Sequence, residues 1–115
     1  AFVKNTASSM KKIISAVHSC GGIAILAHPA YLEDNAEKVI KEFINLGGEG
    51  IEAECPYASF EEAAGDLRNK FRKIAKDNNL AISGGTDFHE KNNNLNLGNF
   101  GISLEEFNNL KKRLK

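Results

Sequence analysis

The sequence predicts an α/β fold in which parallel strands are joined by crossover helices. Segments with apolar residues at helical spacing alternate with short apolar runs, in the order helix, strand, helix, strand, helix, strand, loop, helix. Alternation of this kind is typical of parallel strands with right-handed connections. A chain of 115 residues is one domain at most and is smaller than most complete α/β enzymes. We therefore expect residues 1–115 to be a single domain or a fragment of one.

The first helix is expected from about Ser8 to Cys20, where apolar residues recur at i, i+3, i+4 and i+7. These positions are Met10, Ile13, Ile14 and Val17. The pair Gly21-Gly22 closes the helix, and a strand over 23–27 follows at once. That run is apolar on both faces, as in a parallel strand covered on both sides.

Two more helix and strand units follow, and a last helix closes the chain. The second helix is expected from about Asn35 to Leu46, before another glycine pair, and its strand over 50–54. The third helix is expected from about 59 to 78, with its strand over 80–83, and the last helix from Ser103. Ser59 with Glu62, and Ser103 with Glu106, have the spacing of a capping box.

Charge and cysteine content exclude several classes of protein. Lys plus Arg is 15 and Asp plus Glu is 15, so no overall field attracts nucleic acid or an acidic membrane surface. Cys20 and Cys55 form no C-x-x-C motif, which makes a reduced, cytoplasmic setting the expectation. The longest apolar run is far too short to cross a membrane, so we expect no membrane partner.

Several metal-binding side chains follow the predicted strands. His28 follows the first strand, Glu52 and Glu54 end the second, and Asp87 and His89 follow the third. The carboxyl ends of parallel strands are where active sites form in barrels and open α/β sheets. If the chain is extended there, residues 87 and 89 point the same way and can share an ion such as zinc, manganese or iron.

Each of these residues also has a plainer interpretation. His28 before Pro29 is a common way to leave a sheet, and Asp87 could stabilise a turn. Either glutamate could be a solvated carboxylate, although strand alternation puts both opposite Ile51 and Ala53. His18 near a helix C-terminus is interpreted as structural or exposed. Cys55 has no histidine in its own segment to activate it, which argues against a covalent cysteine mechanism.

Three motifs in this order resemble the C-terminal half of a PHP domain, the polymerase and histidinol phosphatase family. They are residues 21–29 (GGIAILAHP), 50–52 (GIE) and 83–89 (SGGTDFH), with Leu97-Gly98 after them. The resemblance covers about Met10 to Phe100 and is greatest to stand-alone metal-dependent phosphoesterases. It implies the C-terminal portion of a distorted (β/α)7 TIM-like barrel that holds two or three divalent metal ions.

The resemblance also implies an activity and a site. The activity is hydrolysis of phosphate esters of nucleotides or small metabolites by a metal-activated water, with no catalytic nucleophile from the protein. By position, His28, Asp87 and His89 would be ligands to Mn, Zn, Mg or Fe. Glu52 would bind substrate or lie beside the metal ligands without binding a metal itself.

The chain also departs from the family pattern. The opening His-x-His motif and the further ligands of the first strands are absent, Thr86 replaces a serine, and Glu90 stands where glycine is common. We therefore expect the isolated chain to bind metal weakly and to be inactive without the remaining N-terminal part of the domain. Its exposed sheet edges would favour self-association. The alternative is a degenerate PHP remnant that serves as a non-catalytic α/β binding module.

Overall fold

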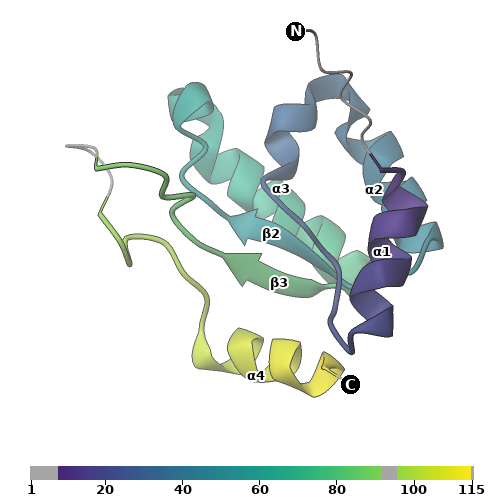
Figure 1. Cartoon of the computed structure of the whole chain (residues 1–115). Coiled ribbons are helices and arrows are strands. Elements are labelled where there is room, and N and C mark those ends of the chain that lie inside the picture. Colours follow the sequence, from purple (N-terminus) through teal and green to yellow (C-terminus); the bar gives the residue numbers. More distant parts are fainter. Residues whose placement is uncertain (1–7, 92–95, 115) are drawn as a thin grey trace, which may run out of the picture.

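The computed structural model describes residues 8–91 and 96–114, and its centre is a parallel three-stranded sheet (Figure 1). The strands β1 (Ile25–Leu26), β2 (Gly50–Glu54) and β3 (Ala81–Gly84) lie in the order β1-β2-β3. In the register, Ile25 pairs with Gly50, and Ile51 pairs with Ile82. The predicted α/β class with parallel strands is confirmed for the described part of the chain.

In the described residues, four α-helices and two 3-10 segments precede, connect and follow the strands. They are α1 (Met10–Ser19), η1 (Pro29–Asn35), α2 (Ala36–Asn45), η2 (Ala58–Ala63), α3 (Ala64–Asp77) and α4 (Leu104–Arg113). The capping box predicted for the last helix is confirmed, because Ser103 and Glu106 bond to each other's backbone N–H.

Two predicted boundaries are wrong. The third α-helix begins at Ala64, because Tyr57 takes a left-handed backbone conformation with φ 48° and the chain then passes through η2. The N-cap of α3 is Ala63, which makes no side-chain cap. The first strand is also shorter than expected, because before it the Ala24 N–H donates to the Glu49 carboxylate instead of to a strand.

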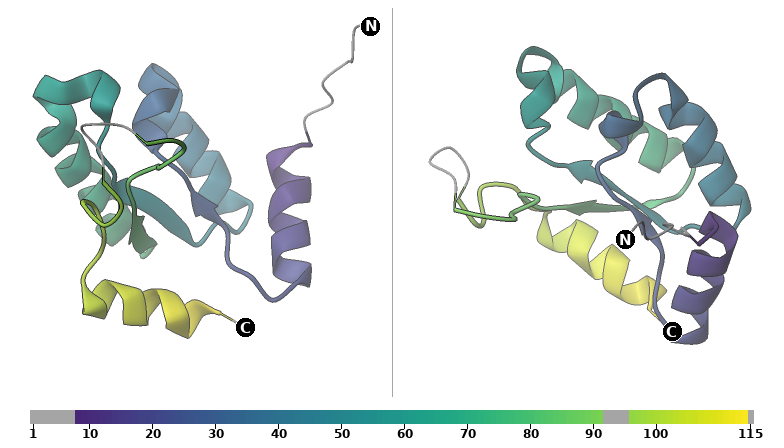
Figure 2. Two further views of the ribbon diagram at one scale, coloured as in Figure 1. Left: turned by 60° about the vertical axis from the view of Figure 1, so that its left-hand side comes forward. Right: turned by 45° about the horizontal axis from the view of Figure 1, so that its top comes forward.

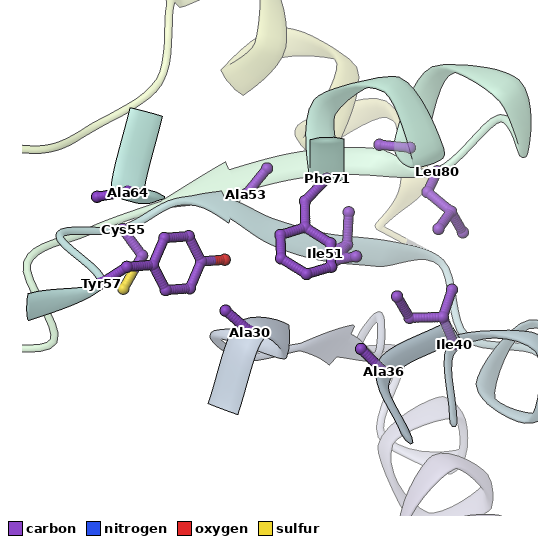
Figure 3. Close-up of a cluster of buried hydrophobic side chains, with 11 residues drawn as sticks. Ala30, Ala36, Ile40, Ile51, Ala53, Cys55, Tyr57, Ala64, Phe71 and Leu80 are labelled. Carbon is purple, nitrogen blue, oxygen red and sulfur yellow. The ribbon is translucent and has the colours of Figure 1, made fainter. Parts of the chain in front are cut away.

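The main core lies between the sheet and the helices α2 and α3. Ile51 and Ala53 on β2 are fully buried and pack in one cluster with Phe71 of α3 and Ile40 of α2 (Figure 3). A second cluster, made of Ile14, Ala24 and Phe43, packs α1 beside β1. Because side chains alternate along a strand, Glu52 points to the face opposite Ile51 and Ala53.

Charged side chains hold the remaining elements to the sheet. The Arg72 guanidinium pairs with Glu54 of β2 and with Glu106 of α4, so it connects the last helix to the sheet. At the other end of α4, Arg113 donates to the carbonyl oxygens of Glu49, at 3.3 Å, and Asn79, at 2.8 Å. These bonds fix α4 beside β3.

The segment after β3 extends beyond the ends of the strands. The right-hand view of Figure 2 shows this connection projecting from the sheet on either side of the grey trace. Residues 87–91 are exposed, in contrast to the buried Thr86 just before them. Two predicted ligands therefore lie on a projecting segment. No helix in the described residues is long and apolar enough to cross a membrane.

Candidate metal centre at the carboxyl ends of the strands

The candidate ligands lie at the edge where all three parallel strands end. His28 comes two residues after β1, Glu52 is in β2, and Asp87 comes three residues after β3. The buried thiol of Cys55 lies at the same edge, one residue after β2. Burial raises its pKa, and the nearby carboxylates of Glu52 and Asp87 raise the pKa further. A thiol kept protonated in this way is a poor nucleophile, in agreement with the prediction against cysteine catalysis.

Glu52 contacts the residue that leaves β1 and lies near the segment after β3. Its Oε2 accepts a hydrogen bond of 2.9 Å from the backbone N–H of His28. Its Oε1 lies 3.8 Å from the position that a Cβ would take at Gly85. The backbone carbonyl of Glu52 in turn accepts a 3.2 Å hydrogen bond from the hydroxyl of the buried Tyr57. Glu52 therefore joins the end of β2 to the residue that leaves β1, and its side chain lies near the segment after β3.

His28 has an unusual backbone, with φ 28° and ψ 62°. A positive φ is strained for a residue with a Cβ, and it persists only where the surroundings hold it. The hydrogen bond from its N–H to Glu52 is one such constraint, and Pro29 at the start of η1 is another. The imidazole ring meets the ring of Tyr31 edge-on, with centroids 5.3 Å apart and planes at 84°.

Asp87 and His89 lie side by side, but by a different geometry from the one predicted. The expectation of an extended chain is wrong, since Asp87 has a left-handed φ of 51°. His89 Nδ1 lies 2.6 Å from the Asp87 carbonyl oxygen and 3.4 Å from its carboxylate Oδ1. A carbonyl oxygen only accepts, so Nδ1 carries a hydrogen in this contact, and in the neutral ring Nε2 is the nitrogen with a lone pair. Histidine ligands to metals are commonly oriented in this way.

The donor types fit a divalent metal, but the described residues do not close a site. Two imidazoles and a carboxylate suit zinc, manganese or iron. In residues 8–91 and 96–114, however, no group of three or more His, Cys, Asp or Glu side chains is near enough to hold one ion. The side chain of His89 is 78% exposed and that of Asp87 is 38% exposed, so both side chains are open to solvent.

The two other candidates from the sequence have structural partners. Glu54 pairs with Arg72 at 3.0 Å and with Arg68 at 3.5 Å, both on α3, across a register shift in β2. Of the two strand-end glutamates, it is thus Glu52 that contacts His28. His18 Nε2 lies 2.9 Å from Glu49 Oε2 near the amino ends of the strands, which agrees with its structural interpretation.

Two features of the edge were missed by sequence reasoning. The bond from Glu52 to the backbone of His28 joins residues that are far apart in the chain, and only the register of β1 against β2 brings them together. Tyr31 was not singled out, although it lies three residues after His28. The i+3 spacing within a turn was the signal that could have identified it.

Comparison with known proteins places the chain beside phosphoesterases. It is 36% identical over 93 residues to a 5′-3′ exoribonuclease of Haemophilus influenzae, a match that covers 77% of this chain and 32% of that protein. A crystal structure from Bifidobacterium adolescentis, with the provisional name metal-dependent phosphoesterase, superposes with a TM-score of 0.75 at 21% identity. That match covers 99% of this chain and 40% of the other. No family model matches the sequence.

These matches set the extent of the similarity. The chain spans about a third of the length of the exoribonuclease and 40% of the crystallised protein. The structural match shows that the three parallel strands and their helices have the fold of part of a phosphoesterase. The resemblance predicted from the strand-end motifs is thus confirmed, for a part of such a protein.

Proposed function

From its similarity to part of a PHP-type metal-dependent phosphoesterase, we propose that this chain supplies one portion of a phosphoesterase site. The reaction is hydrolysis of phosphate esters by a metal-activated water. The observation that carries the proposal is that His28, Glu52 and Asp87 lie at or just after the carboxyl ends of three neighbouring strands, with Glu52 bonded to the His28 backbone, in a chain 36% identical to an exoribonuclease. Such an edge is the usual place for catalysis in parallel α/β folds.

In this proposal the ligands are His28, Asp87 and His89. The hydrogen bond from His89 Nδ1 to the Asp87 carbonyl presents Nε2 for coordination, and Glu52 holds the backbone of His28. When bound, a divalent cation lowers the pKa of a water molecule and neutralises charge on phosphoryl oxygens. The protein residues orient the donors, and no side chain here is needed as a nucleophile.

The remaining ligands come from outside this segment. We place the three strands in a (β/α) barrel whose N-terminal part lies against α1 and β1. An apolar hollow of about 600 Å³ between these elements supports this arrangement. Met10, Ile13, Val17 and Ile25 are among the residues that line it. In the residues that the structure describes, β1 pairs with a strand on one side only, so its other edge can accept a strand or a second copy of the chain.

The substrate proposed is a nucleotide or another phosphorylated small molecule. The similarity to a 5′-3′ exoribonuclease favours the nucleotide. The zero net charge of the segment agrees with recognition at a local site rather than through a broad basic surface.

Metal analysis and hydrolysis assays on the full-length protein test this function. Asp87→Ala and His89→Ala should each lower metal content and reduce hydrolysis by a factor of about 100 or more. Loss of a metal ligand should reduce activity at least as much as loss of a residue that hydrogen-bonds to a ligand. Glu90→Ala is the matched control, since Glu90 is an exposed acid in the same segment. If Asp87→Ala and His89→Ala leave metal content and hydrolysis unchanged, the assigned ligands are wrong. If the wild type hydrolyses no phosphate ester, a non-catalytic binding module replaces this proposal.

A further inference from the structure

A continuous series of aromatic rings runs from the core to the surface beside His28. Phe71 and Tyr57 form its buried end, at 1% and 0% exposure, with ring centroids 6.0 Å apart. Tyr31 follows at 6.3 Å from Tyr57 and 5.6 Å from Phe60. Beyond Tyr31, at 5.3 Å, lies the imidazole of His28. The series therefore ends at a predicted metal ligand.

Tyr31 differs from the buried rings because 43% of its surface is open to solvent. Its ring is nevertheless held in place, since Tyr57 and Phe60 pack against it and its N–H donates to the carbonyl of His28 at 3.2 Å. A ring held in this way loses little conformational entropy when a ligand covers it. Packing against the core explains why part of the Tyr31 ring is buried. It does not explain why an aromatic ring is exposed to solvent at this position.

We propose that Tyr31 is a stacking platform for a nucleobase of the substrate, so that the substrate class is a nucleotide unit of single-stranded nucleic acid. This inference rests on the proposed function, because it uses His28 as the marker of where the phosphate is held. A nucleotide carries its base one ribose away from its phosphate. Because Tyr31 contacts His28, the base and the phosphate of one nucleotide would lie at neighbouring positions.

A nucleobase fits the Tyr31 ring better than a small sugar phosphate does. Every nucleobase has a π-face, and aromatic side chains bind bases in single strands with little sequence preference. Single strands are needed because their bases are free to leave the helical stack. A sugar phosphate without a base would gain little from this ring, so the presence of the base becomes the variable to test.

Equilibrium binding to the full-length protein, with metal removed by chelation to prevent cleavage, tests the platform. The probe is a short single-stranded oligoribonucleotide with 2-aminopurine at its 5′ end, whose fluorescence falls on stacking. Tyr31→Leu should abolish the quench and weaken binding by about ten-fold, because it keeps apolar bulk and removes the π-face. Tyr31→Phe is the matched control, and it should quench and bind like the wild type.

A second oligonucleotide, abasic at its first three 5′ positions, separates stacking from a general structural effect. Wild type and Tyr31→Leu should bind this probe equally. The proposal is overturned if Tyr31→Leu still quenches 2-aminopurine, or if it weakens the normal and abasic probes by the same factor. Absence of hydrolysis by the metal-loaded wild type would instead overturn the phosphoesterase function, which this binding measurement does not use.

Discussion

The carboxylate of Glu52 accepts a hydrogen bond of 2.9 Å from the backbone N–H of His28. This bond joins the middle strand, β2, to the residue that follows β1. His28 has a positive φ that needs such support. Glu52 thus supports the backbone of a residue that we propose as a metal ligand.

Replacing Glu52 should loosen His28. We expect Glu52→Ala to lower the free energy of unfolding by roughly 1–3 kcal/mol, because the half-buried N–H of His28 loses a charged acceptor. Metal affinity should fall by about 10–100 fold, as it does when other residues that hydrogen-bond to metal ligands are removed. Glu52→Gln retains an acceptor oxygen and should recover most of both quantities. Denaturant titration and metal titration measure them, and equal losses in Ala and Gln variants would contradict the positioning role.

Gly84 should not tolerate a side chain. A Cβ there would lie 2.6 Å from the Cβ of Glu54 and 2.7 Å from its carbonyl oxygen, where the backbone of β2 passes. Gly84→Ala should therefore destabilise the protein by about 1–3 kcal/mol, the usual cost of overpacking. Gly101→Ala is the control, because nothing lies within 4 Å of its added Cβ. Thermal melts of the two variants compare these costs, and similar melting temperatures would refute the steric argument.

The attachment of α4 should weaken in acid. Burial alone would raise the pKa of Glu106, but its bonds to the Arg72 guanidinium and to Ser103 are together stronger and hold that pKa below its ordinary value. A pKa that is lower in the folded state contributes stability above the unfolded value, and this contribution is lost as pH falls below about 4. Unfolding measured from pH 7 down to pH 3 should thus show a steeper loss in wild type than in Glu106→Gln. Parallel curves would exclude this ion pair as the cause.

Two histidines at opposite ends of the sheet should behave differently. His18→Ala removes the hydrogen bond to Glu49 and should cost about 0.5–1.5 kcal/mol of stability without changing metal content. His28→Ala should reduce metal content in the full-length protein. Elemental analysis of both purified variants measures their metal content. Metal loss in His18→Ala alone would reverse the two assignments.

Periodic signals in the sequence were enough for the helices and for the order of the parallel strands. The apolar stripe of α1 and the capping box at Ser103 depend on residues a few positions apart, and both were predicted correctly. The start of α3 was not, because the left-handed Tyr57 and the 3-10 turn after it depend on burial of that ring in the core. Propensity along the chain carries no such information.

The candidate site was predictable in its location and less so in its geometry. Strand-end logic placed His28, Glu52 and Asp87 at one edge. It could not show that Asp87 turns left-handed or that Glu54 is held by α3, because both depend on tertiary contacts. The ligand roles of His28, Asp87 and His89 stay predictions until metal is measured.

The network of Arg113, Glu49 and His18 ties α1, β2 and α4 together at the end of the sheet remote from the candidate ligands. This network and the candidate ligands therefore lie at opposite ends of the same strands. Mutational tolerance should follow this division. Libraries randomised over 88–91 should yield many folded variants with altered chemistry, whereas libraries at the amino ends of the strands should yield mostly unfolded chains.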